Sequence, residues 1–149
     1  MVWGGFSYHH RTPLIPIEGN LTAQRYIDEV LDPEVVPFFQ QHQDLTTFQQ
    51  DNARPHAARQ TIHFLHAEGM EVLPWPAYSP DLNPIEHLWD QLGRRVGSRL
   101  DQPTTRARLI QLLQEEWNLI PQECLRRLIR SMRDRCRAVI DAGGGHTRY

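Results

Sequence analysis

The apolar residues near the start of the chain are spaced as in β-strands. Residues 2–8 and 13–18 are short runs rich in aromatic and branched side chains, and Gly, His and Arg residues bound them. This pattern predicts two strands of a hairpin. Pro13 and Pro16 lie in the second run, and because proline cannot donate a ladder hydrogen bond, we expect that run to be an edge strand.

The spacing becomes helical in the next stretch of chain. Thr22 is a suitable N-cap, and the apolar residues after it recur at helical intervals, so the sequence predicts a helix from Thr22 to about Gln41. Pro33 and Pro37 interrupt this stretch, and we expect them to break or kink the helix because proline removes an intrahelical hydrogen bond. The residues expected on its buried face are Tyr26, Ile27, Val30 and Leu31.

The middle of the chain has the pattern of a strand, a helix and a second strand. Residues 45–50 are expected to form the first strand, residues 56–68 a helix that Gly69 ends, and residues 70–74 the second strand. Two strands joined by a helical crossover are normally parallel, so the pattern predicts an α/β sheet. Asp51 follows the first strand directly and is therefore expected at its carboxyl end.

A proline-rich loop, residues 74–84, separates this pattern from the helical second half of the chain. Asn83 and Pro84 have the chemistry of an N-cap followed by proline at the first helical position. They predict a helix that carries Glu86 on its first turn and continues to about Arg99.

The last two predicted helices cover residues 104–119 and 121–141. The second of them has an apolar stripe at helical spacing, and its arginines are expected on the other faces. The stripe consists of Leu125, Leu128, Ile129, Met132, Cys136, Val139 and Ile140, and the arginines are Arg126, Arg127, Arg130, Arg133, Arg135 and Arg137.

Length and composition favour a folded domain. At 149 residues the chain has the length of one domain, and an apolar fraction of 40% predicts a packed core. The sequence contains no run of about 18 to 20 apolar residues of the kind that spans a membrane, so no membrane partner is expected. We expect a sheet-and-helix part, residues 1–93, followed by a helical tail, residues 94–149.

The net charge of −2 conceals an asymmetry between these two parts. Residues 1–93 hold four arginines and twelve acids, whereas residues 94–149 hold twelve arginines and six acids. Arginine binds phosphate in a bidentate manner, so a basic tail is compatible with nucleic-acid binding. The other interpretation is a solvated polar face opposite the core stripe, and the sequence leaves both open.

Asp51 and Glu86 are the acidic residues whose surroundings suggest chemistry. Magnesium for phosphoryl transfer is held by a few carboxylates on rigid elements, and a strand end beside a helix start would supply them. Each residue also has a structural interpretation. Asp51 begins a common turn pair with Asn52, and the spacing from Asn83 to Glu86 is that of a capping box.

Four neighbouring residues are weaker candidates. Asp81 competes for the role of second ligand, although it lies in a segment whose turn residues also explain it. Asn52 and His56 flank Asp51 and could reach the same cleft, while Asn83 could orient Glu86. For all four, a role in a turn or a cap is the simpler interpretation.

Three segments of the chain carry a family resemblance. FQQDNARPH, SPDLNPIEHLW and RRLIRSMRDRCRAVIDAGGGHTRY resemble the catalytic domain of Tc/mariner DDE transposases, and the likeness runs from Met1 to Tyr149. It implies an RNase H-like mixed sheet with flanking helices, DNA cleavage and strand transfer, and two Mg²⁺ or Mn²⁺ ions. Asp51 and Glu86 match the second and third acidic positions of that family. The resemblance also implies DNA as partner, with possible pairing to another copy or an intact transposase, and a nuclear location.

The first aspartate of that family has no counterpart in this sequence. The resemblance places the central strand that bears it upstream of Met1, so we expect a sheet without that strand, weak metal binding and no activity of the chain alone. The alternative is a non-catalytic module that binds DNA or a transposase through Arg126, Arg127 and Arg130. A third possibility is a fragment that does not fold stably.

Overall fold

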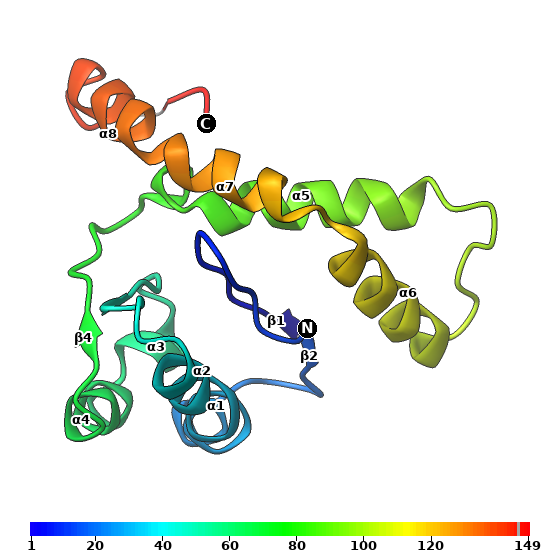
Figure 1. The fold of residues 1–149 in the computed structure, drawn as a ribbon, viewed down its shortest axis with the longest axis horizontal. Helices are drawn as coiled ribbons and strands as arrows, with labels where there is room; N and C mark the ends of the chain where they lie inside the picture. Colours follow the sequence, from blue (N-terminus) through cyan, green and yellow to red (C-terminus); the bar gives the residue numbers. More distant parts are fainter. Residues whose placement is uncertain (146) are drawn as a thin grey trace. The chain divides into compact units, whose positions relative to one another are not determined.

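The computed structural model describes residues 1–145 and 147–149 and divides into two compact units (Figure 1). The first unit consists of Met1–Trp3 and Ile15–Tyr78, and the second of Gly4–Leu14 and Ser79–Tyr149. The first contains β1 (Val2–Trp3), β2 (Ile15–Pro16), α1 (Ala23–Tyr26), η1 (Ile27–Val35), α2 (Val36–Gln41), β3 (Thr47–Phe48), α3 (Arg54–Ala57), α4 (Arg59–Ala67) and β4 (Glu71–Val72). The second contains η2 (Pro80–Leu82), α5 (Pro84–Gly97), α6 (Arg106–Leu119), α7 (Gln122–Arg130) and α8 (Met132–Asp141).

The strands of the first unit form two short ladders. β1 and β2 are antiparallel, with Trp3 opposite Ile15, and β3 and β4 are parallel, with Phe48 opposite Val72. The predicted hairpin and the predicted parallel crossover are therefore confirmed, although each ladder is only two residue pairs long. Among the described residues, no strand joins the two ladders.

The first long helical segment changes from an α-helix to a π-helix in the stretch that contains a proline. Thr22 caps it as predicted, because its side chain accepts a hydrogen bond from the Arg25 N–H at 3.2 Å. Pro33 was expected to break or kink the helix, but the chain stays helical and widens into the π-helix η1. Proline clashes with the carbonyl four residues earlier in an α-helix, and a wider turn relieves that clash. Pro37 lies in the first turn of α2.

The predicted helix over residues 56–68 is two helices. α3 begins earlier, at Arg54, and Ala58 is extended (ψ 139°) before α4 resumes. The buried Thr61 hydroxyl donates to the Pro55 carbonyl at 2.7 Å, which stabilises the break. Gly69 ends α4 as predicted, since its φ of 70° suits glycine and the surrounding hydrogen bonds form a Schellman motif.

An apolar cluster holds the first unit together. All four residues expected on the buried face of the first helical segment belong to it, and Leu65 of α4 packs against them. The fully or nearly fully buried members are Ile17, Tyr26, Ile27, Val30, Leu31, Val35 and Leu65. Because Phe48 and Val72 also pack on this cluster, it fixes the ladder of β3 and β4 relative to the helices.

Trp117 of α6 is the central side chain of the second unit. It is 1% exposed, and its ring stacks on that of Trp89 with 5.4 Å between the centroids. Gly4 lies so close that a Cβ atom there would be 3.1 Å from the Trp117 ring. Arg11 donates to the carbonyls of Trp117 and Ile120 at the end of α6, where a cation is favourable.

The predicted single helix over residues 121–141 is also interrupted. Ser131 separates α7 from α8, and its hydroxyl donates to the Leu128 carbonyl at 2.6 Å. A serine that bonds to a carbonyl of the preceding turn commonly bends a helix. Within the described residues, no helix is both long and apolar enough to cross a membrane.

The ion pairs that Glu116 of α6 makes with Arg95 in α5 and with Arg99 just after it should make the second unit sensitive to acid. The side chain of Glu116 is 7% exposed and accepts from both Arg99 and Arg95 at 2.8 Å. These hydrogen bonds, that from Arg99 foremost, lower the pKa of Glu116 below 4.5. Its stabilising contribution is therefore complete above pH 4.5 and is lost as the pH falls through the lowered folded value.

We expect Glu116→Gln to lower the urea midpoint at pH 7 and to have much less effect at pH 3. Glu123→Gln is the matched control, because that exposed glutamate pairs with Arg130 at the surface. An equal loss of stability from Glu116→Gln at both pH values would contradict this assignment.

Candidate functional site

Asp51 lies three residues after β3 and is held by its own turn. Its Oδ1 atom accepts a hydrogen bond from the Ala53 N–H at 3.0 Å and lies 2.6 Å from Nδ1 of His56. Both contacts use the same carboxylate oxygen. Within the described residues, Oδ2 accepts no hydrogen bond, and the side chain is 44% exposed. Asp51 is thus oriented on one side and open to a ligand on the other.

His56 is fixed from the opposite side by Tyr26. The two rings lie 4.5 Å apart, and the Tyr26 hydroxyl donates to the side-chain oxygen of Gln50 at 3.0 Å. Burial raises the pKa of Tyr26, so the hydroxyl keeps its proton and remains a donor. The predicted neighbour His56 is therefore in direct contact with Asp51, and the buried Tyr26 holds its ring.

Asn52 makes a structural contact in the turn that carries Asp51. Its side-chain amide donates to the Trp75 carbonyl at 2.9 Å, and so connects the turn after β3 with the chain after β4. This contact fixes the loop that carries Asp51, which agrees with the simpler interpretation, a role in a turn.

Glu86 lies on the first turn of α5, as predicted. Asn83 caps this helix through its side-chain oxygen, 3.4 Å from the Ile85 N–H, and Pro84 occupies the first helical position. Asn83 is 8% exposed, whereas Glu86 is exposed to solvent. A carboxylate in the first turn of a helix is favoured by the helix dipole. Asn83 therefore fixes the start of the helix, and Glu86 projects from it.

Asp81 is occupied by contacts within the second unit. Its Oδ2 atom accepts from the Thr147 hydroxyl at 2.8 Å, and its carbonyl accepts from Arg135 at 2.6 Å. These contacts give Asp81 a structural role in the turn before α5.

Arg135 corrects the expectation that the arginines of the last helix all occupy polar faces. It is 1% exposed, and its guanidinium contacts Asp81, Ser131 and His87. The spacing could have revealed this, because Arg135 follows Leu128 by seven residues and Met132 by three, on the side of the apolar stripe. Only its charge argued for the surface.

Two of the three arginines expected to bind DNA contact the tip of the hairpin. Arg126 and Arg130 lie over the Tyr8 ring at 5.5 and 5.3 Å, and both also pair with Glu123. Arg127 is exposed, and its guanidinium lies 3.2 Å from the Cys124 sulfur. The role of these arginines in DNA binding stays a prediction.

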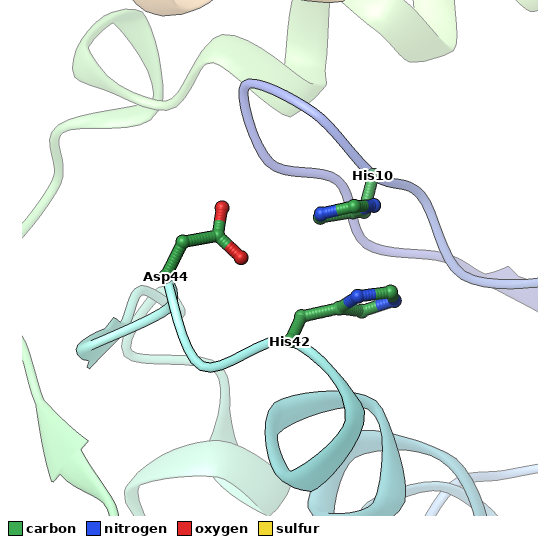
Figure 2. A group of neighbouring side chains, drawn as sticks. All are labelled: His10, His42 and Asp44. Atoms are coloured by element: carbon green, nitrogen blue, oxygen red, sulfur yellow. The ribbon is translucent and has the colours of Figure 1, made fainter.

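Figure 2 shows His10, His42 and Asp44, side chains of types that bind metal ions. His42 and Asp44 follow α2 in the first unit, and His10 belongs to the second. The three side chains therefore belong to different units and do not form a site within either of them. Asp51 likewise belongs to the first unit and Glu86 to the second.

The comparison with protein families identifies the chain. A family model described as "DDE superfamily endonuclease" matches residues 1–109, which include Asp51 and Glu86. The chain belongs to the DDE superfamily endonuclease family.

Two nematode relatives agree with this assignment. The DDE chain is 37% identical to the transposase of the transposable element Tcb1 from Caenorhabditis briggsae over 152 residues, and 37% identical to the Tc1 transposase from Caenorhabditis elegans over 150 residues. Each alignment covers all of this chain and 54% of the relative. The chain thus spans about half the length of these transposases.

A solved structure gives the fold of the DDE chain. The catalytic domain of the Mos1 transposase from Drosophila mauritiana, solved with raltegravir and Mn, superposes with a TM-score of 0.75 at 22% identity. The match covers 99% of this chain and 82% of that one. The predicted RNase H-like fold is therefore confirmed.

The donors of the DDE chain suit a hard divalent cation. Asp51 presents an oxygen without a hydrogen bond among the described residues, and Glu86 is an exposed carboxylate on a capped helix. Carboxylate oxygens are the ligands that Mg²⁺ and Mn²⁺ prefer. The rigid turns behind both residues meet the need for fixed ligand positions.

Proposed function

We propose that this chain supplies part of the active site of a transposase that cleaves and joins DNA with Mg²⁺ or Mn²⁺. Asp51 and Glu86 are two of the carboxylates that hold the metal. The observation that carries the proposal is the oxygen Oδ2 of Asp51, which accepts no hydrogen bond from the described residues, while Oδ1 is held by His56 and Ala53. An aspartate that only stabilises a turn needs the bond from the Ala53 N–H but not the contact with His56. A metal ligand is held in a fixed orientation by such a second contact.

The protein residues would contribute orientation, and the metal would supply charge neutralisation at the phosphate. His56 and the Ala53 N–H hold the Asp51 carboxylate in one rotamer. Asn83 and Pro84 fix the first turn of α5, and with it the origin of the Glu86 side chain. Preorganised ligands of this kind matter because phosphoryl transfer depends mainly on positioning and electrostatics.

DNA is the substrate that the relatives and the charge pattern favour. The Tcb1 and Tc1 relatives are transposases of transposable elements. The arginine-rich residues 94–149 carry twelve arginines against six acids, which suits a polyanion. We extend the proposal to a nuclear location, where a transposase would meet chromosomal DNA, and to assembly with a second transposase chain.

A plasmid-nicking assay tests this proposal. The purified chain is incubated with supercoiled DNA in Mn²⁺, Mg²⁺ or EDTA, alongside Asp51→Ala and Glu86→Ala. We expect any cleavage to require the metal and both carboxylates, since each is a ligand. Cleavage that persists in both variants would refute the proposed site.

The alternative of a non-catalytic binding module makes a different prediction. It requires DNA binding that is independent of metal, weakens as salt is raised, and is weaker in Arg127→Gln but unchanged in Asp51→Ala. Arg127 is the informative position because Arg126 and Arg130 also hold Tyr8, so their replacement would disturb the hairpin tip.

A further inference from the structure

Arg135 is a buried cation whose contacts converge on one turn. It is 1% exposed, and burial lowers its pKa. Its guanidinium donates from Nη1 to the Asp81 carbonyl at 2.6 Å, and Nη2 lies 3.1 Å from Nδ1 of His87. Its Nε atom donates to the Ser131 hydroxyl at 2.9 Å. Burying a charge raises the free energy of the folded state, and the acceptors of this guanidinium are neutral groups. The buried position of Arg135 therefore calls for a function that explains it.

The turn that Arg135 contacts is the one that carries Glu86. Asp81 lies in η2, directly before the cap of α5, and His87 follows Glu86 in the first turn of that helix. One planar guanidinium therefore holds the chain on both sides of Glu86. The geometry requires His87 to accept at Nδ1, and so to be neutral.

The end of the chain closes over the same guanidinium. The Tyr149 ring lies 4.9 Å from the guanidinium carbon, and the Thr147 hydroxyl donates to the Asp81 carboxylate at 2.8 Å. The cation–π contact and the hydrogen bond from Thr147 thus bring residues 147–149 to the turn before α5. Three separate segments, α8, the C-terminal residues and η2, meet at Arg135.

We propose that Arg135 is a positioning residue for Glu86: its guanidinium clamps the Asp81–His87 turn and so sets the direction in which α5 presents the carboxylate. This inference rests on the proposed function, in which Glu86 binds metal. It assigns the arginine-rich tail a role within the site in addition to any contact with DNA. Lysine would not replace Arg135, because a single ammonium group cannot span the Asp81 carbonyl and the His87 ring as a fork does.

Hydrogen exchange of the full 149-residue chain tests the clamp without reference to activity. The amides of Asn83 and Glu86 donate within the turn, to the carbonyls of Pro80 and Asn83. We expect Arg135→Gln to speed their exchange by about ten-fold or more, because the turn opens locally when its anchoring hydrogen bonds are lost. Arg135→Lys should give an intermediate rate. Arg133→Gln is the matched control, an exposed arginine on the same helix, and should change nothing.

Binding of Mn²⁺, measured by titration calorimetry, is the second readout. If Arg135 positions Glu86, Arg135→Gln should weaken Mn²⁺ binding by about 10- to 100-fold, as the loss of an outer-shell partner does at other sites. A circular dichroism melt checks that each variant is folded. If Arg135→Gln does not fold, Arg135→Lys carries both measurements.

The outcomes separate this inference from the proposed function. Unchanged exchange at Asn83 and Glu86 would overturn the clamp. If Arg135→Gln speeds the exchange but leaves the Mn²⁺ affinity unchanged, and that affinity depends on Glu86, the positioning role would be overturned. If the unsubstituted chain binds no Mn²⁺ through Glu86, the proposed metal site fails and the role toward Glu86 fails with it, while exchange still decides whether Arg135 holds the turn.

Discussion

Replacing Asp51 by asparagine or Glu86 by glutamine should weaken Mn²⁺ binding by on the order of 100-fold or more. Loss of an outer-shell partner already costs about 10- to 100-fold at metal sites, and here a ligand itself loses its charge. Both substitutions keep the shape of the side chain. For Asp51, the hydrogen bond from the Ala53 N–H can also persist, since an amide oxygen accepts as well. The backbone should therefore be undisturbed.

Titration calorimetry with Mn²⁺, at one pH and ionic strength, measures this effect. Asp90→Asn is the matched control, because Asp90 is an exposed carboxylate on α5 that pairs with Arg94. We expect its Mn²⁺ affinity to equal that of the unsubstituted chain. An equal, small loss of Mn²⁺ affinity from all three substitutions would mean that binding depends only on the net charge of the chain. That result would refute the site made of Asp51 and Glu86.

Trp117→Ala should lower the free energy of unfolding by about 3–5 kcal/mol, the usual cost of truncating a large buried aromatic side chain. Three interactions are lost together: the stacking on Trp89, the packing against Gly4, and the hydrogen bond from the indole N–H to the Thr12 carbonyl at 2.9 Å. The substitution also leaves that buried carbonyl without this donor, which adds a desolvation cost.

Urea denaturation followed by far-UV circular dichroism checks this second expectation. Trp117→Phe serves as the comparison, because it keeps an aromatic ring and loses the indole N–H, so its effect should be smaller. Truncating a core residue leaves a destabilising cavity. A loss of less than about 1 kcal/mol for Trp117→Ala would therefore contradict the assignment of Trp117 to the core.

The sequence predicted best where a local rule acts on a few adjacent residues. Thr22 and Asn83 cap helices because their side chains bond to an N–H two or three residues away. Gly69 ends α4 because glycine tolerates a positive φ. Glu86 follows Asn83 by three residues, so its place on the first turn of α5 follows from the same rule.

The same reasoning failed where distant groups compete with the local pattern. The predicted single helices break at Ala58 and Ser131, where a side-chain hydroxyl satisfies a carbonyl that the helix would otherwise use. The chain stays helical at Pro33 because it adopts a π-helix there, whose wider turn accommodates the proline ring. Arg135 was expected at the surface because charge usually outweighs spacing, and its partners Asp81 and His87 lie 54 and 48 residues earlier.

By itself the sequence therefore determined the family, the two candidate carboxylates, the turn of Asp51 and the capped helix start of Glu86, since motifs, caps and helical spacing depend on neighbouring residues. The tertiary structure alone decided what surrounds them. It placed His56, backed by Tyr26, against one oxygen of Asp51, and it buried Arg135 beneath the turn of Glu86. Contacts of this kind depend on which distant segments share a core, and no local pattern records that.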